Sequence, residues 1–227
     1  MVFRCIYRHV ALLYTVSMPA SSNILYYVHD PMCSWCWAFR PCLLRLKDNL
    51  PEQISWHNVL GGLAPDSDQP MPGQMRQMIQ GHWRRIQSSI GTEFNFDFWT
   101  QCQPRRDTYK ACRAVLAAAH QDAEEAMIEA IQKAYYLRAM NPSDPETLAD
   151  LATELGLDRP LFVEDFYSEK TAAELRRQFL LRDGLNVRSF PSLVLKHDSR
   201  LTIIHHDYQD FRVSLAEIQS CLAAAYV

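Results

Sequence analysis

The sequence predicts an α/β protein in which a β-α-β unit and a later β-β-α unit are separated by a large all-helical stretch. Two apolar runs flank a helical pattern between residues 24 and 60. Helical spacing then fills residues 74–183, and strand character returns only at residue 192. With 48% hydrophobic residues, a net charge of −3 and no basic run, the chain can bury a core and is not expected to bind nucleic acid.

The first unit is a strand, a helix and a second strand. Ile24–Val28 is a short apolar run rich in aromatic residues, which is typical of a buried strand, and a turn is expected at His29-Asp30-Pro31. Residues 37–50 carry apolar side chains at helical spacing, and residues 54–60 form a second apolar run. The connection is long enough for a right-handed crossover, so the two strands are expected to be parallel.

The rest of the chain divides into a helical insertion and a closing unit. A short aromatic segment is expected at 94–99, and helices are expected at 74–89, 107–120, 123–140, 145–155, 159–168 and 168–183. The closing unit is a hairpin of 192–196 and 201–205, followed by a helix over 215–225. Without the insertion, this element order is that of a thioredoxin fold.

We therefore divide the chain into four segments: an N-terminal extension (1–22), a first thioredoxin-like part (23–63), a helical insertion domain (64–183) and a second thioredoxin-like part (184–227). The extension holds two arginines before an apolar stretch of residues 10–16, so it is either a weak signal peptide or a segment upstream of a start at Met18. A cytoplasmic location is expected, or a periplasmic one if the extension acts as a signal. No stretch is long enough to span a membrane, and no membrane partner is expected.

The motif Cys33-Ser34-Trp35-Cys36 lies where the first strand leads into the first helix. A sulfur at a helix N-terminus meets unpaired backbone N–H groups and the positive end of the helix dipole, which favour a thiolate. The second cysteine lies one turn later on the same face, within disulfide reach. A zinc site would need a second pair of ligands at similar spacing, which the sequence lacks, so no metal is expected. The motif therefore predicts thiol–disulfide chemistry, with Cys33 as the nucleophile.

The remaining cysteines are assigned no chemistry. Seven cysteines at scattered spacing do not form a secreted disulfide framework and fit a reduced protein with one active pair. Cys42 and Cys112 are expected to be buried, because a free cysteine packs as a small hydrophobic residue.

Three motif neighbours have two interpretations each. His29 and Asp30 either tune the thiolate or simply form the turn. Trp35 either faces the substrate or packs in the core.

Several runs of residues resemble the DsbA family of thioredoxin-like proteins, in the branch of FrnE-type protein-disulfide isomerases. The runs are Tyr26–Trp37, Gly61–Leu63, Ala111–Val115, Gln132–Tyr136 and Phe190–Leu193, and the resemblance covers residues 23–225. It implies a thioredoxin domain interrupted by a helical domain. The best-studied periplasmic members have Pro-His between the cysteines, whereas this chain has Ser34-Trp35. The strong oxidising power of those members is therefore not expected here.

The resemblance also gives a role to Phe190 and Pro191. Alone, a proline directly before a strand indicates a strand edge or a turn. In thioredoxin folds this position holds a cis-proline that faces the two cysteines. The family therefore implies that the Phe190–Pro191 bond is cis and that the Phe190 backbone pairs with an extended substrate.

The predicted function is a thiol–disulfide oxidoreductase or isomerase with Cys33 and Cys36 as catalytic residues. Trp35, Phe190 and Pro191 are the expected substrate contacts, and Ser34, His29 and Asp30 are candidates for tuning the thiolate. Expected partners are protein or peptide thiols and disulfides, with glutathione or a thioredoxin-type protein as electron partner, and no cofactor other than the redox-active disulfide.

Two alternatives remain open. The first is a glutathione-dependent enzyme of the kappa-class transferase or 2-hydroxychromene-2-carboxylate isomerase type. The second is a client-binding chaperone without catalytic activity.

Overall fold

The computed structural model describes residues 23–223. The expectations for the extension at 1–22 and for the last two residues of the C-terminal helix, 224–225, lie outside the described residues. Within residues 23–223, no helix has both the length and the apolar character that a membrane crossing requires.

A four-stranded sheet forms the centre of the fold. Its strands are β1 (Asn23–His29), β2 (Ile54–Leu60), β3 (Ser192–His197) and β4 (Arg200–Ile204). They lie in the order β2-β1-β3-β4, with β1 parallel to β2 and β3 antiparallel to both β1 and β4. The predicted α/β fold, with its parallel first pair and its hairpin, is confirmed.

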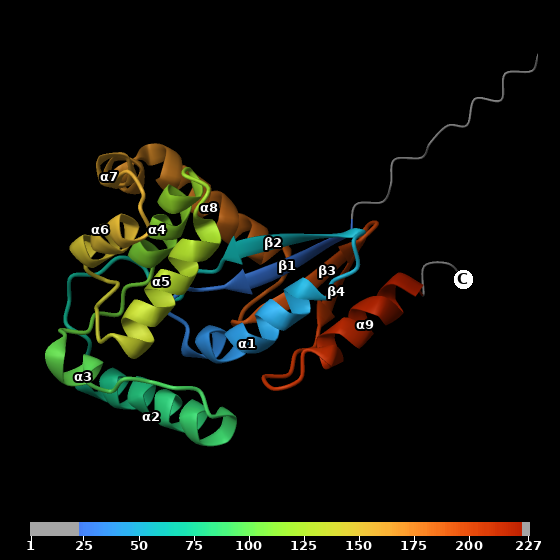
Figure 1. Cartoon of the computed structure of the whole chain (residues 1–227), viewed down its shortest axis with the longest axis horizontal. Coiled ribbons are helices and arrows are strands. Elements are labelled where there is room, and N and C mark those ends of the chain that lie inside the picture. The colour runs from blue at the N-terminus through green and yellow to red at the C-terminus, as the bar shows by residue number, and fades with distance from the viewer. Residues whose placement is uncertain (1–22, 224–227) are drawn as a thin grey trace, which may run out of the picture.

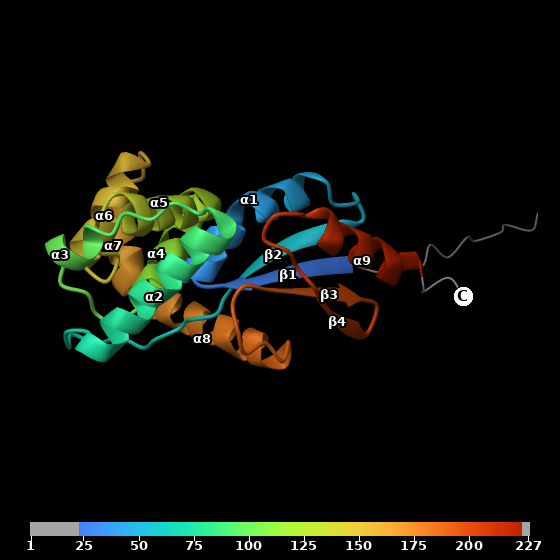
Figure 2. The same cartoon turned by 90° about the horizontal axis from the view of Figure 1, so that it is seen from below.

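The two faces of the sheet are covered by different helices. Leu25 and Tyr27 of β1 point to one face and pack in a core with side chains of α1 (Ser34–Asp48) and α9 (Arg212–Ala223). Alternate β1 residues point to the opposite face, where they pack with the segment that follows α8 (Glu169–Gly184). Figure 2 shows α1 above the sheet and α8 below it. This alternation follows from the two-residue repeat of a strand.

The remaining helices form a body at one end of the sheet (Figure 1). They are α2 (Gly73–Ile90), α3 (Phe98–Gln101), α4 (Tyr109–Ala119), α5 (Glu124–Leu137), α6 (Pro145–Glu154) and α7 (Arg159–Tyr167). Helix α4 packs against α5, α6, α7 and α8, and its face of alanines allows these close approaches. Trp83 and Tyr136 are fully buried in this core. The predicted helical insertion is confirmed, while the exact domain boundaries stay a prediction.

One detail before α1 differs from the predicted elements. The helix itself begins at Ser34 with Cys33 as its N-cap residue, which agrees with the expected place of Cys33 at a helix N-terminus. His29 belongs to β1 and is fully buried, so the predicted turn begins only at Asp30. In that turn the backbone N–H of Cys33 donates to the carbonyl of Asp30 at 3.0 Å. The turn therefore places both cysteines directly above the end of β1.

Candidate active site

Cys33 caps the N-terminus of α1. Its backbone is extended, with φ −84° and ψ 116°, and its carbonyl accepts the first helical hydrogen bond, from the N–H of Trp37 at 3.0 Å. Its side chain therefore begins at the N-terminus of the helix, where the first backbone N–H groups have no partner within the helix. The Sγ atom lies 3.6 Å from the carbonyl oxygen of Phe190, to which the thiol donates. The cysteine motif and the Phe190–Pro191 segment thus meet although 157 residues separate them.

Cys36 lies one turn along α1 and is completely buried, whereas Cys33 keeps 6% of its surface exposed. Both thiols are free in this structure. Burial raises the pKa of the Cys36 thiol well above its ordinary value, and the hydrogen bond with Cys33 raises it further. Cys33 is therefore the cysteine that an incoming disulfide can reach, and Cys36 lies beneath it as a protonated thiol.

Two glycines after β2 allow aromatic rings to pack closely against the backbone, and the first of them packs against Phe190. The Phe190–Pro191 peptide bond is cis. A Cβ atom on Gly61 would lie 2.0 Å from the ring of Phe190, so only glycine lets that ring pack here. Gly62 has φ +67°, and a Cβ atom there would also meet the rings of Phe179 and Tyr109. This packing explains a Gly-Gly pair to which the sequence assigned no role.

Asp30 is fully buried behind the cysteines and is held by several donors. The N–H of Met32 donates to Oδ1 at 2.8 Å, and both the N–H of Leu63 and the hydroxyl of Thr108 donate to Oδ2 at 2.7 Å. Burial raises the pKa of the Asp30 carboxyl, and these hydrogen bonds oppose the rise. Asp30 thus joins the start of α1, the end of β2 and the start of α4 beside the buried thiol.

His29 is also buried, but it has a different environment. Its ring stacks on Tyr27 with 4.7 Å between centroids and 4° between planes, and neither ring nitrogen has a hydrogen-bond partner within residues 23–223. Burial lowers the pKa of His29 to about 4, so the imidazole is neutral at physiological pH. His29 does not line the cleft at Cys33. The idea that His29, Asp30 or Ser34 tunes the thiolate stays a prediction.

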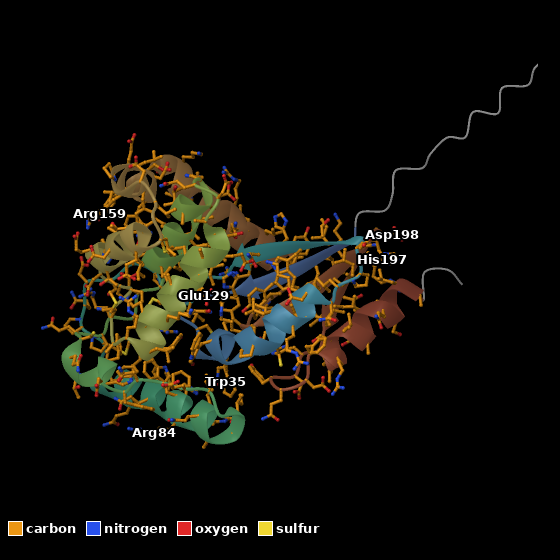
Figure 3. The ribbon with its side chains drawn as sticks, viewed as in Figure 1. Trp35, Arg84, Glu129, Arg159, His197 and Asp198 are labelled. Atoms are coloured by element: carbon orange, nitrogen blue, oxygen red, sulfur yellow. The ribbon has the colours of Figure 1, made fainter. Side chains whose placement is uncertain are left out.

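A cleft of about 330 Å³ opens above Cys33. Ser34, Trp35 and Phe190 line it, together with Met32, Met71 and Met78. Trp35 is half-buried and packs between Tyr208, at 5.3 Å between centroids, and the guanidinium of Arg85, 5.6 Å from its ring. Figure 3 shows Trp35 where α1 approaches α2. Of the predicted substrate contacts, Trp35 and Phe190 line the cleft, while Pro191 is buried behind it.

Two residues at this site carry no signal in the sequence pattern. Thr108 reaches Asp30 from the helical insertion, 78 residues away, so no local motif marks it. Arg106 lines the cleft but precedes α4 as an ordinary charged loop residue. The sequence did contain one sign of the packing around this site, the Gly61-Gly62 pair. A pair of glycines at the end of a strand indicates that another part of the chain approaches the backbone closely. Within residues 23–223, no group of three or more His, Cys, Asp or Glu side chains is placed to hold a metal ion.

Comparisons with solved structures give the same fold. A candidate protein disulfide isomerase from Nitrosomonas europaea matches with a TM-score of 0.78 and 24% identity, over 89% of this chain and 98% of that one. The cytosolic disulfide reductase DsbM from Pseudomonas aeruginosa matches with a TM-score of 0.72 and 26% identity, over 88% and 99% of the two chains. The fold is thus that of the DsbA-like disulfide oxidoreductases.

Sequence comparisons identify a relative that is described as an adapter protein and a family model that matches most of the chain. The ClpXP adapter protein SpxH of Halalkalibacterium halodurans is 24% identical over 181 residues, which are 77% of this chain and 59% of that protein. The chain therefore spans less than two thirds of the length of this curated relative. The family model Thioredoxin_5, described as thioredoxin, matches residues 26–211. That match covers most of the chain, including both cysteines and the Phe190–Pro191 segment, and the chain belongs to this thioredoxin family.

Proposed function

We propose that this protein is a thiol–disulfide oxidoreductase that exchanges disulfides with protein or peptide substrates through Cys33 and Cys36. One observation carries the proposal: the Cys33 thiol lines the cleft at the N-terminus of α1, 3.6 Å from the Phe190 carbonyl, with the fully buried Cys36 one turn behind it. A nucleophilic thiol, a second thiol in disulfide range and a backbone edge are the parts that disulfide exchange needs.

In the first step, the Cys33 thiolate attacks one sulfur of a substrate disulfide. The S–S bond of the substrate breaks, its second sulfur leaves as a thiolate, and a mixed disulfide joins the substrate to Cys33. Charge on the attacking sulfur is favoured by the N–H groups and the dipole of α1. We assign this role to Cys33 because it lines the cleft, whereas Cys36 does not line it and is completely buried.

In the second step, Cys36 attacks the Cys33 sulfur of the mixed disulfide. The substrate leaves as a second thiolate, and Cys33 and Cys36 become an intramolecular disulfide. Cys36 must first lose its proton, which its raised pKa disfavours. Asp30 is a nearby buried carboxylate whose charge acts on Cys36, and its own raised pKa suits it to accept that proton. The reverse sequence oxidises a substrate dithiol, and isomerisation follows when the mixed disulfide is attacked by another substrate thiol.

The lining of the cleft supplies the substrate contacts in this proposal. The Phe190 carbonyl, opposite Cys33, accepts a hydrogen bond from the backbone of an extended substrate. Trp35 and the three methionines offer adaptable apolar surface on either side. A surface of this kind suits substrates of varied sequence.

Glutathione is the small thiol that we propose as co-substrate. The structure of DsbM from Pseudomonas aeruginosa has also been determined with GSH, and it matches this chain with a TM-score of 0.71 and 25% identity. A thioredoxin-type protein could serve as electron partner in the same way. DsbM is described as a cytosolic disulfide reductase, and we propose a cytoplasmic reductase role here by analogy.

The second candidate is a non-catalytic role in binding other proteins. It is favoured by the SpxH relatives, which are described as adapters. An adapter or chaperone would keep its binding activity after both cysteines are replaced. The two functions are therefore separated by variants of the cysteine pair.

The experiment measures reduction of insulin by dithiothreitol with the wild type and with Cys33→Ser and Cys36→Ser. Cys33→Ser should abolish the catalysed rate, and Cys36→Ser should accumulate mixed disulfides that survive on non-reducing gels. Cys221→Ser, a half-buried thiol on α9 away from the cleft, is the matched control and should keep the wild-type rate. If Cys33→Ser retains the wild-type rate, the proposal is wrong. Binding that persists in the double variant would favour the adapter role.

A further inference from the structure

The cleft above Cys33 carries positive charge without any acidic side chain. Arg105 and Arg106 line it, and no Asp or Glu does so among the described residues. The larger hollow on the flank of α1, about 650 Å³, is different because Glu93 and Glu129 line it beside Arg40 and Lys133. Its charges are also paired, since Glu129 binds both Arg40 and Lys133. The uncompensated charge is therefore a property of the cysteine cleft.

Arg105 and Arg106 are neighbours in the chain, but only one of them has a carboxylate partner. Arg105 forms an ion pair with Asp144 at the start of α6. In the described part of the chain, Arg106 has no acidic side chain within ion-pair distance, although it is half-buried. An arginine in such a place presents a planar set of donors suited to a carboxylate.

The positive charge of Arg106 acts on two buried groups near the cysteines, Asp30 and Tyr135. Burial raises the pKa of Asp30, and the positive charge of Arg106 is among the influences that oppose this rise. Burial likewise raises the pKa of Tyr135, another residue of the cleft, and Arg106 again opposes it. Arg106 and Cys33 also line the same cleft, so the guanidinium faces the space that the substituents of a disulfide bound at Cys33 would occupy.

We propose that Arg106 determines substrate specificity by binding a carboxylate of the disulfide or thiol that reacts with Cys33. The preferred substrates are then acidic ones: small thiols that carry carboxylates, such as glutathione, or polypeptides with an acidic residue next to the reactive cysteine. This inference rests on the proposed exchange chemistry at Cys33. Its physical basis is the uncompensated positive charge of the cleft, which attracts anions and repels cations.

The first experiment uses two alkylating agents that differ in charge. Iodoacetate and iodoacetamide both alkylate Cys33, but only iodoacetate has a carboxylate. Arg106→Gln should lower the rate constant for iodoacetate, divided by that for iodoacetamide, by about threefold to tenfold. This is the effect expected of one nearby charge in a partly solvated site. Arg106→Lys should retain most of the ratio. Added salt should compress the ratio in the wild type more than in Arg106→Gln.

The second experiment separates the two sources of the carboxylate. Reduction of glutathione disulfide is compared with that of neutral hydroxyethyl disulfide and cationic cystamine, and peptide disulfides with Glu beside the cysteine are compared with their Gln counterparts. Arg106→Gln should slow the acidic member of each set selectively. An effect on glutathione disulfide alone assigns the site to small thiols, and an effect on the Glu peptides assigns it to polypeptides. Arg84→Gln, on the exposed side of α2 (Figure 3), is the matched control.

Two outcomes would overturn the inference. If Arg106→Gln lowers both alkylation rates equally, the arginine acts on the Cys33 sulfur and not on the ligand. If the ratio does not change, Arg106 has no role in selection. Failure of the proposed function would give a different result. In that case the wild type and Cys33→Ser would be alkylated to the same extent, because Cys33 would not be the reactive thiol.

Discussion

The two sides of the cysteine pair differ in almost every physical respect. Above Cys33 lies an open cleft whose rim includes Met78, 52% exposed, and Arg106, which has no ion-pair partner among the described residues. Beneath Cys36 lies a floor of fully buried polar groups, Asp30 and His29, which are held by hydrogen bonds or by stacking. The cleft can exchange its contacts with water for contacts with a substrate, but the floor cannot. Substitutions in the floor should therefore lower the free energy of unfolding, whereas substitutions in the cleft should leave it nearly unchanged and act mainly on exchange rates.

The largest effect on stability is expected for Asp30→Ala. The substitution removes the acceptor of the Met32 N–H and the shorter of the two hydrogen bonds made by the Leu63 N–H and by the Thr108 hydroxyl. Unsatisfied buried donors are costly, and we expect a loss of about 3 kcal/mol in the free energy of unfolding. Urea denaturation under reducing conditions measures it. Asp68→Ala, at a side chain that is 97% exposed, is the control and should change little. A loss no larger than that of the control would show that the floor does not depend on Asp30.

His29→Phe should remove a pH dependence of stability. The native pKa of about 4 lies below the ordinary value of 6.5, so the unfolded chain binds a proton that the native protein excludes between these values. Stability therefore falls as the pH falls through this window, and His29 should contribute about 2 kcal/mol of the loss between about pH 7.5 and about pH 5.

Urea midpoints of the wild type and of His29→Phe at the two pH values test this expectation. His57→Phe, at an exposed position of β2, is the control and should keep the wild-type dependence. If the difference between the wild type and His29→Phe is the same at both pH values, His29 does not titrate as its burial implies.

The smallest effect is expected for Met78→Ala on the rim of the cleft. Met78 is more than half exposed, so its truncation creates no cavity, and we expect the free energy of unfolding to stay within about 0.5 kcal/mol of the wild type. Thermal unfolding followed by circular dichroism is sufficient to measure it. A loss near that of Asp30→Ala would contradict the distinction between cleft and floor.

Local pattern predicted the elements well because their signals lie within a few residues. The apolar runs of β1 and β2, the hairpin after Pro191 and the helices of the insertion all appear close to their expected positions. The motif of Cys33 and Cys36 likewise needed only a strand, a turn and a helix to be interpreted. The error at His29 has a local cause, since a histidine before Asp-Pro is typical of a turn, whereas here pairing with Leu60 of β2 extends the strand.

The sequence by itself determined the α/β class, the reactive pair and the helical insertion, because strand and helix periodicity and cysteine spacing are encoded in neighbouring residues. Only the tertiary structure decided which distant groups surround that pair. Thr108 and Arg106 of the insertion line the same cleft as Cys33, and the ring of Phe190 packs against Gly61. Such contacts depend on how the insertion packs against the sheet, and that packing is set by the shapes of buried side chains over the whole molecule.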